Sequence, residues 1–185
     1  MSDSSKKGGQ RPSTMAALLE DKPKRGRPPH NVSRQNVYVA LSKEQKQGMS
    51  ELAALLPKGL ARADLPDMSI TILSARLESL RRDVADRNRE IPEGVTDFIS
   101  LYLLWDLALP SDEGTAKWTS IRVSPQQAIE LGRVYGTLNA AFGVNRSEAF
   151  GLGLELLGQY LSTYPLPEGK VTLAEVRKEI KRIYL

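Results

Sequence analysis

Two arginines that flank a glycine form the most specific chemical pattern in this 185-residue chain, within the segment Pro-Lys-Arg-Gly-Arg-Pro-Pro at 23–29. Gly26 has no side chain to hold the backbone away from a groove floor, and Pro28 sets an extended backbone that cannot continue a helix. Arg25 and Arg27 can therefore run in opposite directions along the narrow, electronegative minor groove of A·T-rich DNA. The alternative is a solvated basic linker, because Lys, Arg, Pro and Gly are common in disordered tails.

The quartet from Arg25 to Pro28 resembles the core of the AT-hook family, and Lys24 and Pro29 agree with the basic and proline flanks of that family. The resemblance covers residues 23–29 alone. It implies that the side chains of Lys24, Arg25 and Arg27 contact the minor groove while Gly26 lets the backbone approach it.

Charge is divided unevenly along the chain. Residues 1–34 carry eight Lys and Arg against three Asp and Glu, a net charge of +5, whereas the remaining 151 residues carry 18 against 19, a net charge of −1. We therefore expect a disordered basic arm over residues 1–33 and a nearly neutral globule after it. This distribution favours a polyanion such as DNA as the partner, with a solubilising tail as the alternative.

The composition argues against several other classes of protein. The chain, 41% hydrophobic, has no apolar stretch that could cross a bilayer, and its start lacks the apolar core of a signal peptide, so we expect a cytoplasmic, nucleoid-associated protein with no membrane contact. There is no Cys, which excludes disulfides and thiolate metal sites. The single histidine is His30, inside the arm, so a His-based triad or zinc pair is absent. We expect neither an enzyme nor a cofactor or metal.

Two segments alternate apolar and polar residues with period two, which predicts two short strands, at 36–41 and 118–123. Ser42 and Ser124 follow them, and serine is a favoured residue at a helix N-terminus. The inward side chains are expected to be Val37, Val39, Leu41, Thr119, Ile121 and Val123. The outward ones are expected to be Asn36, Tyr38, Ala40, Trp118, Ser120 and Arg122.

The rest of the chain predicts helices, so the fold class is mainly α with short β-strands. Apolar residues at helical spacing place the helices at 42–56, 69–89, 95–109, 124–142, 145–161 and 172–184. The 95–109 helix is apolar on most sides, which is typical of a core or an interface. The last helix, within residues 165–185, is amphipathic.

The order strand, helix, glycine turn and helix between Trp118 and Leu161 resembles the ribbon-helix-helix family, the MetJ/Arc-type DNA-binding proteins. In that family two strands pair into an antiparallel ribbon that lies in the major groove. For residues 115–164 the resemblance implies that Arg122 forms a bidentate contact to guanine and that Ser120 bonds to any base. Trp118 either packs on sugar and phosphate or covers the edge of the core.

The Gly143-Val-Asn-Arg-Ser-Glu148 turn is the most specific part of this resemblance. It implies that the helix start from Asn145 through Arg146 to Ser147 offers free backbone N–H groups to a DNA phosphate. Plain capping of the helix by Asn145 and Glu148 is the other interpretation, and the two are compatible.

Residues 34–110 resemble a second, more divergent copy, in which Asn36 and Tyr38 face the DNA and Arg34 supplies the charge that the strand lacks. Two helices compete to complete this copy. The helix from Ser69 has the right separation from the strand, whereas the helix after Gly94 is closer in composition to the one after Gly143. We prefer the latter, which makes residues 58–93 an insertion.

Two copies would let one chain form the ribbon alone, as a pseudo-dimer that reads a non-palindromic site. The alternative is that only the C-terminal copy is a true unit and pairs with its mate in a homodimer. The sequence thus predicts a transcriptional regulator, such as a repressor, that binds double-stranded DNA with A·T-rich flanks. A plasmid partition or relaxosome accessory protein, or an antitoxin, would in addition bind a protein partner through the 95–109 or 172–184 helix.

Overall fold

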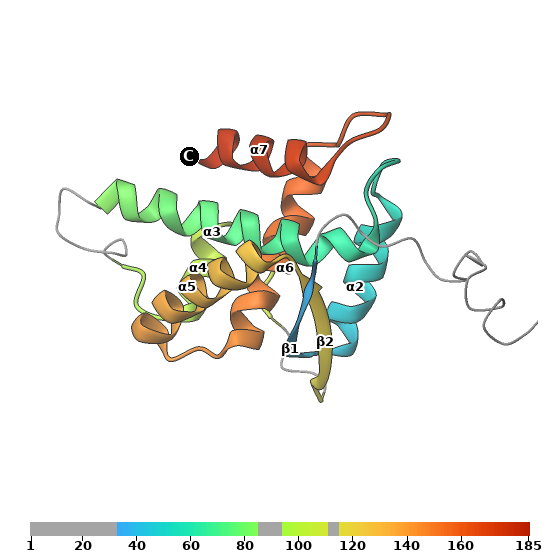
Figure 1. Ribbon diagram of the computed structural model, residues 1–185. Helices are drawn as coiled ribbons and strands as arrows, with labels where there is room; N and C mark the ends of the chain where they lie inside the picture. The colour runs from blue at the N-terminus through green and yellow to red at the C-terminus, as the bar shows by residue number, and fades with distance from the viewer. Residues whose placement is uncertain (1–32, 85–93, 111–114) are drawn as a thin grey trace, which may run out of the picture. The chain divides into compact units, whose positions relative to one another are not determined.

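The computed structural model of this protein describes residues 33–84, 94–110 and 115–185, which form a mainly helical fold with one small antiparallel sheet (Figure 1). The basic arm, including the hook-like residues Lys24, Arg25, Gly26 and Arg27, lies outside the described residues. The elements in order are β1 (Gln35–Leu41), α2 (Lys43–Ala54), the 3-10 helix η1 (Arg62–Asp64), α3 (Leu65–Val84), α4 (Phe98–Leu104), β2 (Lys117–Val123), α5 (Pro125–Phe142), α6 (Arg146–Thr163) and α7 (Leu173–Tyr184).

The sheet consists of β1 and β2, which pair antiparallel within the one chain, from Gln35 opposite Val123 to Leu41 opposite Lys117. One face of this ribbon is buried: Val39 and Val123 are 0% exposed. The alternating pattern thus placed both strands and their inner faces correctly, except that Val37 and Thr119 are only half-buried. The sequence left open whether the ribbon forms within one chain or between two, and in this structure both of its strands come from the same chain.

Local capping explains where the helices begin. The Ser42 hydroxyl accepts a hydrogen bond from the Gln45 N–H (3.1 Å) while the Gln45 side chain accepts one from the Ser42 N–H (3.0 Å), which starts α2. Asn145 and Glu148 form the same reciprocal pair at the start of α6. Gly143 ends α5 in the left-handed conformation, with φ 70°. These caps confirm the predicted starts of α2 and α6 and the predicted end of α5, whereas Ser124 precedes α5 without a side-chain capping hydrogen bond.

The core is organised around α3. This helix runs through the middle of the fold, with α7 packed along one side, α5 along another, and α6 crossing it (Figure 1). The crossing is close, because a Cβ atom added at Gly153 of α6 would lie 2.9 Å from the backbone oxygen of Ser69 in α3. A smaller cluster between α6 and the ribbon includes Val39, Ile121 and Phe150.

Two expected helix boundaries are wrong. The helix predicted from Ser69 begins four residues earlier, at Leu65, and Ser69 is a buried interior residue whose hydroxyl donates to the Leu65 carbonyl (2.9 Å). The helix predicted at 95–109 covers only Phe98–Leu104, because the Asp97 side chain caps it and Asp106 adopts a left-handed φ of 54° just after it. Local polar groups thus shorten α4, whereas the fully buried Leu65 and Met68 extend the apolar pattern of α3 toward its N-terminus.

The preference for the helix after Gly94 as the partner of the first strand is not supported. It is α3 that packs against α5 and α6, and α3 follows a turn like the one before α6. Gly59 and Gly143 both have positive φ, 103° and 70°. Five residues after each glycine, an acidic side chain accepts a hydrogen bond from a backbone N–H. Asp64 accepts from the Ala61 N–H (2.7 Å), and Glu148 accepts from the Asn145 N–H (2.6 Å). The two halves therefore share the order strand, helix, glycine turn and helix.

Within the described residues we find no helix whose length and hydrophobicity would let it pass through a bilayer.

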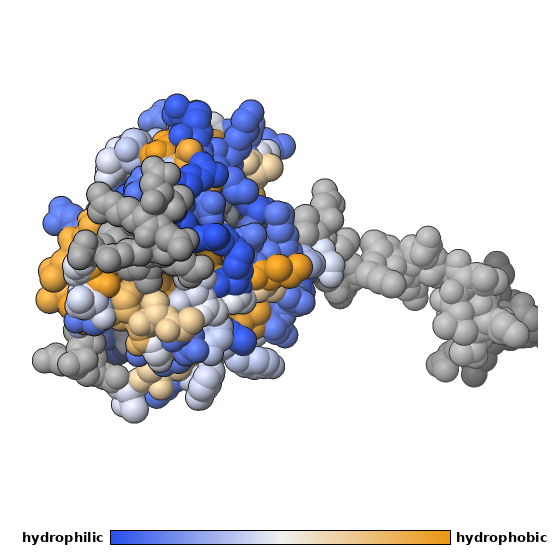
Figure 2. Space-filling view, turned by 90° about the vertical axis from the view of Figure 1, so that its left-hand side faces the viewer, coloured by the Kyte–Doolittle hydropathy of each residue, from blue (hydrophilic) through white to orange (hydrophobic). Residues whose placement is uncertain are grey.

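The surface of the protein carries exposed hydrophobic side chains. Hydrophobic patches interrupt a largely hydrophilic face in Figure 2. Helix α4 exposes Ile99 (41%), Leu103 (66%) and Leu104 (47%). The short α4 is thus only half covered.

Candidate nucleic-acid interface

The outer face of the ribbon brings together side chains from both strands. Residues that oppose each other in an antiparallel pair point to the same side of the sheet, so each outward residue has an outward partner. The pairs are Asn36 with Arg122, Tyr38 with Ser120, and Ala40 with Trp118. Except for the half-buried Ala40, all these residues are exposed.

Trp118 and Arg122 lie near opposite ends of β2. The Trp118 side chain does not cover the core edge, since the residue is 74% exposed. Its packing on sugar and phosphate stays a prediction. Arg122 is also exposed, and its guanidinium pairs with no carboxylate in the described part of the chain. A charged group in that state is free to make a bidentate contact with a guanine edge.

The start of α6 differs from expectation in its hydrogen bonding. The Asn145 side chain accepts from the N–H groups of Ser147 (2.8 Å) and Glu148 (3.1 Å), and the Asn145 N–H donates to Glu148 (2.6 Å). The N–H groups of Asn145 and Ser147 that we expected to bind phosphate are therefore already used by the capping box. The Ser147 hydroxyl accepts from the Ala40 N–H (2.8 Å), which fastens α6 to β1.

The Arg146 side chain, at the start of α6, is the group there that could contact a DNA phosphate. Arg146 is exposed, and its guanidinium lies 5.6 Å from the centre of the Tyr135 ring, a cation–π contact that holds the group in place. A hollow of about 710 Å³ is lined by Arg146 and Tyr135 and, from the ribbon, by Tyr38 and Trp118. Aromatic faces opposite a cation suit a sugar-phosphate backbone.

Arg62 is a candidate phosphate-binding residue that the sequence patterns did not identify. It is exposed in η1, three residues after Gly59, as Arg146 comes three residues after Gly143. The 3-10 helix contacts β2 as the start of α6 contacts β1. The shared spacing Gly-x-x-Arg-x-acidic was visible in the sequence and would have pointed to Arg62.

Arg34 is not available to DNA, contrary to expectation. Its guanidinium donates to the Ala63 carbonyl and pairs with the Asp64 carboxylate, and it lies 4.0 Å from Asp67. The Arg34 side chain is only 6% exposed. Two buried carboxylates at the start of α3 need an opposite charge, and Arg34 supplies it. This residue therefore joins the beginning of β1 to η1 instead of contacting a ligand.

No cluster of His, Asp or Glu suited to a metal ion occurs in the described residues. Searches with models of known protein families, among curated proteins and among solved structures found no match to this chain.

Proposed function

We propose that this protein binds double-stranded DNA in a sequence-specific manner by laying the β1–β2 ribbon in the major groove, as ribbon-helix-helix proteins do, and that it regulates transcription. In this proposal a single chain forms a pseudo-dimer. The halves are β1, α2 and α3 on one side and β2, α5 and α6 on the other.

An internal two-fold relation supports the pseudo-dimer. The strands correspond at a spacing of 82 residues, which relates Tyr38 to Ser120, and these two residues face each other at the middle of the ribbon. The helices after the glycine turns correspond at a spacing of 84 residues, which relates Ser69 to Gly153, and these two residues meet where α3 crosses α6. A two-fold axis requires equivalent residues to meet on it, and both places satisfy that requirement.

The two halves of the outer face carry different chemistry, which favours a non-palindromic site. Asn36 and Tyr38 come from β1, whereas Ser120 and Arg122 come from β2. In this proposal Arg122 reads guanine and Asn36, directly opposite, reads an adjacent base, for which adenine is the natural partner of an amide side chain.

The backbone contacts in this proposal come from Arg62 and Arg146, one beside each end of the ribbon. Phosphate contacts position a protein on the duplex without reading its sequence. The hook-like segment at 23–29 precedes β1 by fewer than ten residues of chain. A tether that short gives the hook a high effective concentration for a minor groove beside the site.

The observation that carries the proposal is Arg122, which is exposed on the outer face of the ribbon and pairs with no carboxylate among residues 33–84, 94–110 and 115–185. The test is selection of bound duplexes from a random pool with the full chain, followed by titration of the selected site and a random duplex. A bidentate arginine contact contributes about 1–3 kcal/mol, so Arg122→Ala should weaken binding to the selected site by about 5- to 150-fold and binding to the random duplex much less.

Arg81 gives the matched control, because it is an exposed arginine on α3 whose removal changes the net charge equally. Arg81→Ala should leave both affinities nearly unchanged. A pool with no enriched sequence would refute the proposal. An equal loss on both duplexes for Arg122→Ala would make Arg122 a phosphate contact and move the base-reading role elsewhere.

A second candidate function keeps the DNA contact and adds a protein partner, as in partition or relaxosome accessory proteins. The exposed apolar side chains of α4 favour it. In that case Leu103→Lys should abolish binding of the partner to the DNA complex while the affinity for DNA alone stays unchanged.

A further inference from the structure

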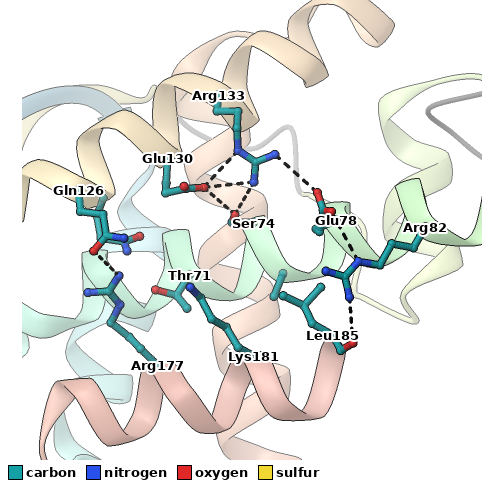
Figure 3. Close-up of a pocket in the computed structure, with 12 residues that line it drawn as sticks. Thr71, Ser74, Glu78, Arg82, Gln126, Glu130, Arg133, Arg177, Lys181 and Leu185 are labelled. Carbon is teal, nitrogen blue, oxygen red and sulfur yellow. Dashed lines mark hydrogen bonds and ion pairs between the residues drawn. The ribbon is translucent and has the colours of Figure 1, made fainter. Parts of the chain in front are cut away.

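A cavity of about 220 Å³ lies between α3, α5 and α7, away from the ribbon face. Its lining is mostly polar or charged, and Figure 3 shows Arg177 and Lys181 extending from α7 toward the other two helices. The two residues are four apart on one helix, so they lie on the same face of α7.

Two of the residues that line this cavity carry buried polar atoms without partners in the described part of the chain. Gln127 is 2% exposed, and its side-chain oxygen accepts no hydrogen bond from any described residue. The Nε of Arg177 is also buried without an acceptor in the described residues. An unsatisfied buried polar group costs about 1–3 kcal/mol, and native proteins retain few of them without a ligand or water to satisfy them.

The charges around the cavity leave an excess of cations on the α7 side. The two glutamates are engaged: Glu130 with Arg133 (3.1 Å), and Glu78 with Arg82 (3.6 Å) and Arg133 (3.9 Å). Lys181, in contrast, forms no ion pair with a described residue, and Arg177 donates only to the Gln126 side chain (3.2 Å).

Glu130 remains an anion and limits where a ligand can lie. Burial by itself would raise the pKa of Glu130, but hydrogen bonds from Ser74 and Arg133 and the charge of Lys181 together outweigh burial and lower the pKa. A second anion is therefore repelled from the α5 side of the cavity and attracted to Lys181 and Arg177.

We infer that this cavity binds a small anion that also carries a hydrogen-bond donor, either a phosphate or a hydroxycarboxylate. The anionic oxygens accept from Lys181 and Arg177, and the hydroxyl group donates to the Gln127 side-chain oxygen. Pockets for drug-sized ligands are commonly about 300–1,000 Å³, so this cavity suits an anion of a few heavy atoms and is too small to enclose a nucleotide. The inference concerns a site separate from the ribbon, and it is tested without DNA.

The experiment measures binding to the full chain by calorimetry and by the shift in melting temperature, with sodium chloride at equal ionic strength as the reference. The probes are inorganic phosphate, glycolate and acetate. Phosphate or glycolate should raise the melting temperature above the reference, and which of them does so identifies the anionic group. Acetate lacks the hydroxyl, so glycolate should bind about 2- to 12-fold more tightly than acetate if the site prefers carboxylates.

Two exposed lysines on α7 provide a matched pair of variants, because Lys181 lines the cavity and Lys178 does not. Lys181→Gln should weaken binding of the active probe by about tenfold or more, since a hydrogen bond to a charged group contributes about 1.5–3 kcal/mol. Lys178→Gln should leave binding unchanged. Gln127→Met should remove the advantage of glycolate over acetate.

The inference fails if none of the three probes raises the melting temperature above the chloride reference. It also fails if Lys178→Gln weakens binding as much as Lys181→Gln does, because the effect would then be general attraction of anions. Neither result would bear on DNA binding, which is measured separately through Arg122.

Discussion

Glycine at the crossing of α3 and α6 leads to a prediction of opposite effects from two similar substitutions. Gly153 lies inside α6 and Gly136 inside α5, both in helices of 18 residues. Alanine is a better helix former than glycine by about 1 kcal/mol at an interior position. Helix propensity alone therefore predicts that both Gly→Ala changes stabilise the protein.

The surroundings of the two glycines separate them. A Cβ atom at Gly136 would meet nothing within 4 Å. A Cβ atom at Gly153 would lie 2.9 Å from the Ser69 oxygen and 3.5 Å from the Leu73 Cβ. The oxygen belongs to the backbone of a buried helix, so α3 and α6 must move apart, and overpacking of this kind costs about 1–3 kcal/mol.

The expected free energies of unfolding follow from these two contributions. Gly136→Ala should raise the free energy of unfolding by about 0.5–1 kcal/mol. In Gly153→Ala the same gain is outweighed by the steric cost, which gives a net loss of up to about 2 kcal/mol. The two variants should thus differ by about 1–3 kcal/mol.

Urea unfolding of the full chain, followed by far-ultraviolet circular dichroism, measures this difference. With a slope of about 2 kcal/mol per molar urea, the midpoints of the variants should lie about 0.5–1.5 M apart, with Gly153→Ala lower. The slopes must agree for the comparison to hold. A midpoint for Gly153→Ala at or above that of Gly136→Ala would refute the close crossing of α3 and α6.

Five other substitutions, grouped in three predictions, test the remaining parts of the structure. Arg34→Met leaves Asp64 and Asp67 without their opposite charge and should lower the free energy of unfolding by about 3 kcal/mol; unfolding at the wild-type urea midpoint would contradict the buried ion pair. Arg62→Gln and Arg146→Gln should each reduce the slope of log affinity against log salt concentration by about 0.9, on specific and random DNA alike. The slopes are measured by DNA titrations at several salt concentrations. If the two variants change the slope by different amounts, that result argues against the two-fold relation. Trp118→Ala should change stability by less than about 0.5 kcal/mol yet weaken DNA binding, whereas Trp105→Ala, at a residue only 5% exposed, should cost about 3–5 kcal/mol; thermal unfolding and DNA titration of the two variants together decide this.

The elements of the fold were largely predictable because they depend on local chemistry. Alternation in 36–41 and 118–123 predicted both strands and their outward residues, since the side chains of a strand point to opposite faces whatever lies above them. Ser42 and Asn145 marked helix starts because a cap is made by residues within one turn. The five exposed ribbon residues followed from the same local rule.

The parts that failed depend on contacts between distant segments. Apolarity favoured the helix at 95–109 over α3 as the helix that follows the first strand and its helix. In the structure α3 takes this place because it crosses α6 at Gly153, and this contact cannot be predicted from either segment alone. Arg34 looked like a free cation because Asp64 and Asp67, its buried partners, lie 30 and 33 positions further along the chain.

The sequence by itself determined the strands, the caps at Ser42 and Asn145 and the outward residues of the ribbon, because each follows from a few neighbouring side chains. The tertiary structure alone decided which helix packs against α5 and α6, which arginines stay exposed, and that three helices line a polar cavity. Those outcomes require segments far apart in the chain to meet, and burial and ion pairing act only after they have met.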